Sequence, residues 1–180
     1  MKNFIYKEIL YEKNLYSRNC IKKNKKLSFL RKKLSSSIDT YNYIKKFFNN
    51  YDKEFLLAIT LDSKNYISSI SIVSIGSINT LNTKPSEVFK TAIITNSTSI
   101  ILVHNHPSGN LKPSLQDDKI TKRVYQVASI LGIELTDHLI ISEESYYSYA
   151  IEGRIDVMNP SRDDYSSPFL NLDEVVLPIH

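Results

Sequence analysis

The chain has 180 residues, of which 42% are hydrophobic and 23% charged, as in an ordinary globular protein. With 4 glycines and 6 prolines it is neither collagen-like nor low-complexity, and no apolar run approaches the roughly 20 residues of a membrane span. The first residues lack a continuous apolar segment and a small-residue cleavage site, so we expect no signal peptide. One cysteine, Cys20, cannot form an internal disulfide, which favours a reducing, cytoplasmic location.

Positive charge is concentrated at the start of the chain. Residues 1–34 contain 11 Lys or Arg and 2 Asp or Glu, whereas the remaining residues contain 12 and 17. The densest basic run lies at residues 22–26. Such a run can attract nucleic-acid phosphates, although solvated lysine-rich segments without that role are commoner. We predict a basic N-terminal arm over residues 1–35 and regard it as the candidate contact for nucleic acid.

The first half of the body alternates helical and strand patterns. Apolar residues recur at spacings of three and four over residues 38–48, after a serine cluster, which predicts a capped helix. Residues 55–61 form a continuous apolar run that predicts a buried strand. Residues 66–75 alternate apolar and serine positions, which predicts a half-exposed strand that ends at Gly76. Pro85 suits the first turn of a helix that we extend to about residue 96.

The second half continues the alternation. Residues 100–103 predict a buried strand, and Ser114 is placed to cap a helix that runs to residue 131 and ends at Gly132. We expect the inner face of this helix to contain Ile120, Val124, Val127 and Leu131. Residues 135–142 and 146–151 predict two short strands, and residues 154–180 a proline-containing tail. Interleaved strands and helices indicate an α/β fold with helices packed on a mixed sheet.

The segment from His104 to Asp117 predicts a metal site. Side chains two apart on a strand share a face, so His104 and His106 point the same way at the end of their strand. Pro107 stops the strand, Gly109 permits a turn, and Asp117 lies on the first turn of the next helix. Two imidazoles and one carboxylate suit Zn²⁺ and leave one position open for water, as in catalytic sites. Ser114 and Asp117 also have capping-box spacing, which would help to aim the carboxylate.

The string His-Asn-His-Pro-Ser-Gly, followed by Pro-Ser-x-x-Asp, resembles the JAMM metal motif of bacterial RadC-type proteins, with ten residues between His106 and Asp117. The resemblance extends over residues 36–153. It implies a JAB/MPN fold, a curved mixed sheet flanked by helices, with the architecture of cytidine deaminases. Deaminase chemistry itself is excluded, because its zinc requires a Cys-x-x-Cys pair and this chain has one cysteine.

The resemblance implies a zinc-dependent hydrolase that cleaves a peptide or isopeptide bond in a peptide or protein substrate. His104, His106 and Asp117 would bind Zn²⁺. Glu54, which precedes the buried strand at residues 55–61, fits the position of the family's general base, and Glu87 is the alternative. Ser114 matches the serine that stabilises the bound water or the oxyanion.

Two alternatives stand beside the hydrolase. The family name is linked to DNA repair, so the chain could be a repair-associated or mobile-element module that binds nucleic acid through the basic arm. Family members often have acidic residues in the second strand, where this chain has Ser68, Ser69 and Ser71. A metal-binding scaffold without turnover is therefore the other alternative.

Overall fold

The computed structural model describes residues 32–47, 53–76 and 83–157. Most of the predicted arm (residues 1–35) and most of the predicted tail (residues 154–180) lie outside these ranges. The first described residues already belong to the folded unit, because Leu34 is buried and Lys33 bridges Tyr66 beside the sheet. No helix in the described ranges has the length and apolar character that a membrane crossing requires.

Five strands form one mixed sheet in the order β2-β1-β3-β4-β5. They are β1 (Phe55–Leu61), β2 (Ile67–Ile75), β3 (Ser99–Asn105), β4 (Glu134–Ile141) and β5 (Tyr146–Ser148). β3 and β4 run parallel, whereas β1–β2, β1–β3 and β4–β5 are antiparallel. A parallel neighbour requires a crossover, and the long helix between β3 and β4 provides it. This confirms the predicted mixed α/β architecture and is consistent with a JAB/MPN fold.

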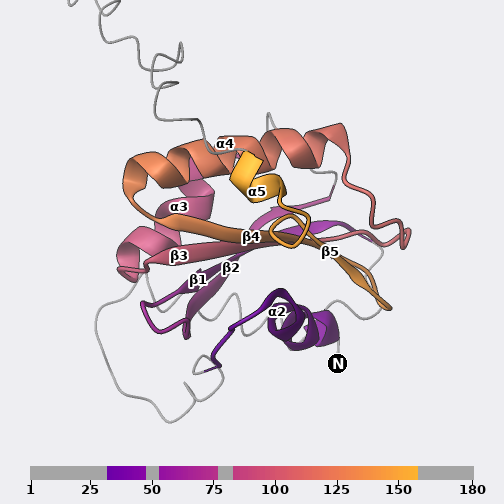
Figure 1. Cartoon of the computed structure of the whole chain (residues 1–180), viewed down its shortest axis with the longest axis horizontal. Helices are drawn as coiled ribbons and strands as arrows, with labels where there is room; N and C mark the ends of the chain where they lie inside the picture. The colour runs from indigo at the N-terminus through magenta and orange to yellow at the C-terminus, as the bar shows by residue number, and fades with distance from the viewer. Residues whose placement is uncertain (1–31, 48–52, 77–82, 158–180) are drawn as a thin grey trace, which may run out of the picture.

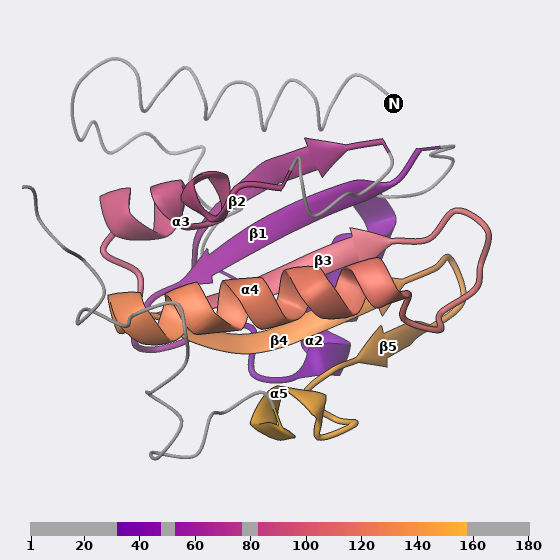
Figure 2. The same cartoon turned by 90° about the horizontal axis from the view of Figure 1, so that it is seen from above.

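Helices cover both faces of the sheet (Figures 1 and 2). α3 (Pro85–Ile94) and α4 (Leu115–Leu131) lie on one face, and α2 (Ser37–Ile44) with the short η2 (Lys45–Phe47) lies on the other; α5 (Arg154–Val157) follows β5. Each face has its own apolar cluster, one containing Leu56 and Leu102, the other Leu57 and Val103. Burial on both faces explains why β1 and β3 read as continuous apolar runs.

α4 begins with a full capping box. The Ser114 hydroxyl accepts the amide hydrogen of Asp117 at 3.2 Å, and the Ser114 amide donates to Asp117 Oδ2 at 2.7 Å. At the other end Gly132 adopts a left-handed conformation, with φ of 66°. Both helix ends therefore lie where the sequence predicts. The reciprocal bonds also fix the direction of the Asp117 side chain at the entrance to the helix.

The inner face of α4 differs from the prediction. Ile120 and Val124 are buried, but Val127 is only half-buried and Leu131 is 43% exposed. Ala128 and Thr121 occupy the buried positions instead. Thr121 Oγ1 is hydrogen-bonded to His138, a buried histidine of β4. Hydrophobic periodicity could not identify a polar contact of this kind.

Candidate metal centre

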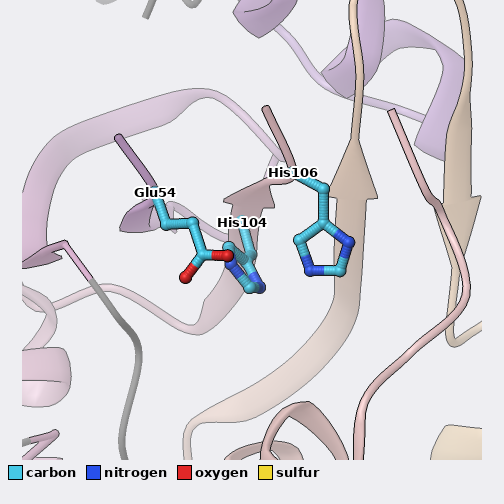
Figure 3. A group of neighbouring side chains, drawn as sticks. All are labelled: Glu54, His104 and His106. Atoms are coloured by element: carbon cyan, nitrogen blue, oxygen red, sulfur yellow. The ribbon is translucent and has the colours of Figure 1, made fainter. Parts of the chain in front are cut away.

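The pairing of β1 with β3 brings the predicted site together. Their antiparallel register places Leu56 opposite His104, and continuing it by two residues places Glu54 opposite His106. All four positions then lie on the same face of the sheet, because the spacing along each strand is two. The side chains of Glu54, His104 and His106 point into a common space (Figure 3). One ligand atom from each of these three residues lies within 4.8 Å of the others.

Asp117 approaches the same pair of imidazoles from α4. Its Oδ1 lies 3.0 Å from His104 Nδ1, and its Oδ2 lies 3.7 Å from His106 Nε2. Burial would raise the pKa of this carboxyl, but interactions with His104 and hydrogen bonds with Ser114 outweigh it and hold the pKa well below its ordinary value. Asp117 is therefore an anion only 2% exposed that faces both histidines.

The loop after β3 fixes the orientation of His106. Its Nδ1 is hydrogen-bonded to the carbonyl oxygen of Asn110, so Nδ1 donates and the lone pair lies on Nε2, the nitrogen that faces Asp117. Gly109, with φ of 78°, allows the turn, and its amide donates to the His106 carbonyl at 3.0 Å. Metal-binding histidines commonly donate their second ring nitrogen to a carbonyl in this way.

The surroundings of His104 suit a metal ligand. The residue is 2% exposed, yet neither ring nitrogen has a partner with hydrogen-bond geometry within the described part of the chain. The 3.0 Å approach to Asp117 is short but misdirected for a hydrogen bond. A short contact with poor hydrogen-bond geometry is typical of two side chains that bind one metal ion, because the lone pair of each ligand atom points at the ion rather than at the other ligand. Orphaned buried nitrogens are rare and costly, so the donor set fits a divalent metal that prefers imidazole and carboxylate.

The other predicted residues are placed as follows. Ser114 is exposed at the start of α4 and acts as its N-cap, while Glu87 is exposed on the first turn of α3. Glu54 and not Glu87 belongs to the cluster around the histidines. In the second strand, Ser69 is buried and hydrogen-bonded to Thr60 at 2.9 Å. The chemical roles of Glu54, Ser114 and Glu87 stay predictions.

A buried polar network lies behind the site. Thr121 Oγ1 donates to the Asp117 carbonyl at 2.6 Å and lies 2.6 Å from His138 Nδ1. His138 stacks on Tyr149, with ring centroids 4.9 Å apart, and its centroid is 6.4 Å from that of His104. His138 lies within β4, and only the fold reveals its link through Thr121 to the backbone of Asp117.

A mixed sheet that gathers Glu54, His104 and His106 at one end, with Asp117 beside both histidines, fits the metal site of a JAB-type domain. The RadC-like JAB domain family matches residues 34–154, and the chain belongs to this family. Similar proteins include UPF0758 proteins of Clostridium acetobutylicum (43% identical over 126 residues), Thermotoga maritima (36% over 132) and Methanococcoides burtonii (41% over 125). These matches cover 69–73% of this chain and 55–59% of the relatives. The chain thus spans little more than half the length of these relatives.

Proposed function

We propose that this chain is a zinc-dependent JAMM-type hydrolase that cleaves a peptide or isopeptide bond. The observation that supports it most strongly is the arrangement around His104, a buried imidazole whose nitrogens make no hydrogen bond to any described residue, flanked by His106 and the anionic Asp117. These three side chains are the proposed ligands. Zn²⁺ in such a set lowers the pKa of water to about 7 and polarises a carbonyl group.

Glu54 is the proposed proton-transfer group. Its carboxylate is half-buried beside the two histidines, within 4.8 Å of their ligand atoms, which is within reach of an intervening water. From this position it can accept a proton from the attacking water and donate it to the leaving amine. The amide bond is broken and the carbonyl carbon gains the hydroxyl, so the proton count balances within the site.

Asp117 and Ser114 have supporting tasks in this proposal. The capping box commits Asp117 Oδ2 to the Ser114 amide, which leaves Oδ1 directed toward His104. The Ser114 hydroxyl accepts the amide hydrogen of Asp117 with a lone pair. Its own proton can therefore be donated toward negative charge that develops on the substrate oxygen.

Metal analysis of the full chain purified without chelators tests the ligand set. We expect one zinc per chain in the wild type and in Glu54→Gln, and loss of zinc in His104→Ala and Asp117→Asn. Hydrolysis of a mixed library of peptides and isopeptide-linked peptides should then fall at least about 100-fold in Glu54→Gln. Absence of zinc from the wild type would overturn the proposal. Zinc with equal hydrolysis in Glu54→Gln would overturn the role of Glu54.

A further inference from the structure

Asn105 lies between the two histidines, but its side chain serves the opposite side of the site. It is the last residue of β3 and only 4% exposed. Its Oδ1 accepts the amide hydrogen of Phe55 at 2.7 Å, and its Nδ2 donates to the carbonyl oxygen of Lys53 at 3.0 Å. The two bonds therefore bracket Glu54, the residue between Lys53 and Phe55.

The strand geometry explains this reach. The backbone register of β1 with β3 ends at the pair Leu56 and His104, so one further step places Phe55 opposite Asn105. Alternation directs Asn105 away from the face that His104 and His106 share. A carboxamide has the same donor and acceptor as a peptide unit. The Asn105 side chain thus extends the hydrogen bonding between β1 and β3 by one residue beyond the last backbone pair.

Both peptide units that flank Glu54 are anchored. The Lys53 carbonyl belongs to the preceding unit and bonds to Asn105; the Phe55 amide and the Glu54 carbonyl belong to the following unit. The Phe55 amide bonds to Asn105, and the Glu54 carbonyl accepts from the Gly76 amide at 2.8 Å. With both units fixed, the two backbone dihedrals of Glu54 are fixed, and so is the direction of its Cα–Cβ bond.

The Glu54 carboxylate depends on this backbone anchor. Among the described residues, no hydrogen bond or ion pair is found between the Glu54 carboxylate and another side chain. Its location beside the histidines is therefore set by where the backbone points it. We propose that Asn105 is a positioning residue for Glu54, a carboxamide clamp that aims the carboxylate at the metal centre. This inference rests on the proposed function, because it assigns Glu54 a task there.

The test uses the full chain loaded with Co²⁺ in place of zinc. Co²⁺ causes paramagnetic shifts in nearby side-chain resonances that depend steeply on distance and direction, so the Glu54 methylene signals report where the carboxylate lies. We expect Asn105→Ala to bind one Co²⁺ as the wild type does, since His104, His106 and Asp117 remain. The Glu54 paramagnetic shifts should decrease, and the amide of Phe55 should exchange faster with solvent.

Matched variants separate positioning from general destabilisation. Ser69→Ala removes a buried hydrogen bond from β2 to Thr60 of β1, the strand that follows Glu54, and should leave the Glu54 shifts at wild-type values. Asn105→Asp keeps the acceptor for the Phe55 amide and loses the donor to Lys53, so it should give intermediate shifts. It also provides the test if Asn105→Ala does not fold.

Kinetics on any substrate found give a second readout. Asn105→Ala should lower kcat about 100-fold with KM unchanged, and it should cause no further loss in Glu54→Gln, because the clamp acts only through that carboxylate. If the Glu54 shifts in Asn105→Ala are unchanged although the Phe55 amide exchanges faster, the role of Asn105 is wrong while the proposed function still stands. Failure of the wild type to bind Co²⁺ would overturn the proposed function and this inference together.

Discussion

His138 should make the stability of this domain sensitive to acid. The side chain is 1% exposed on β4 and stacks on Tyr149. The Thr121 hydroxyl donates to the Asp117 carbonyl, so His138 Nδ1 must carry the proton of the second bond and Nε2 is the site that would titrate. Nε2 is buried and has no hydrogen-bond partner among the described residues.

The pKa of His138 is lowered to about 3, mainly by burial and also by electrostatic interaction with His104 and His106, which together outweigh the opposite effect of Asp117 and Asp118. In the unfolded chain the pKa is 6.5. Between these values the unfolded state binds the proton and the folded state does not, so stability falls as the pH decreases below 6.5. The slope is about 1.4 kcal/mol per pH unit. Between pH 7.5 and 4.5 the loss is therefore about 3 kcal/mol, and it depends little on the folded-state pKa.

The perturbation is His138→Phe, which keeps a ring against Tyr149 and removes both nitrogens. Urea unfolding of the wild type and the variant is measured at pH 7.5 and 4.5, with a chelator present so that metal loss does not contribute. We expect the free energy of unfolding to fall about 3 kcal/mol more in the wild type than in His138→Phe. Equal losses in the two proteins would refute the reasoning, because every titratable group other than His138 is the same in both.

Three further predictions concern the helix cap, the metal and the arm. Ser114→Ala should destabilise the protein by about 1 kcal/mol in thermal unfolding, with Ser114→Thr near wild type. Its zinc content should not change, because the backbone amide of residue 114 still bonds to Asp117. An unchanged Tm in Ser114→Ala would contradict the prediction. Zinc at 100 times its Kd should raise the free energy of unfolding of the wild type by about 2.7 kcal/mol and leave that of His106→Ala unchanged. If a chelator then lowers the free energy of unfolding equally in both proteins, this prediction is wrong. If the arm binds DNA, replacing the four lysines of residues 22–26 by glutamine should reduce the logarithmic salt slope by about 3 to 4, whereas an unchanged slope excludes these lysines.

Local sequence signals predicted the elements that surround the site. The apolar run at residues 55–61 predicted the bounds of β1, and the structure confirms them. The predicted caps at Ser114 and Gly132 also mark the two ends of α4. The ends of strands that depend on pairing with a neighbouring strand were predicted less accurately. β3 extends to Asn105, beyond the predicted residue 103, because the polar His104 and Asn105 still pair with Ile140 and Ile141 of β4. β5 ends at Ser148, short of the predicted residue 151.

The metal-ligand candidates were visible from spacing, whereas their support was not. His104, His106 and Asp117 lie within one short segment, so strand alternation and a helix cap suffice to bring them together. The place of Glu54 depends on the register of β1 against β3, which joins residues about 50 positions apart. The contacts of Asn105 with Lys53 and Phe55 depend on the same register. No local pattern encodes it, which is why the clamp appears only in the fold.

Anomalous diffraction at the zinc absorption edge, on crystals of the full chain purified without chelators, tests the central claim most directly. We expect one peak bonded to His104, His106 and Asp117 at about 2.0–2.2 Å, with Glu54 outside the first coordination shell and close to the remaining open position. No peak between these side chains, or a peak ligated by Glu54 in place of Asp117, would contradict it.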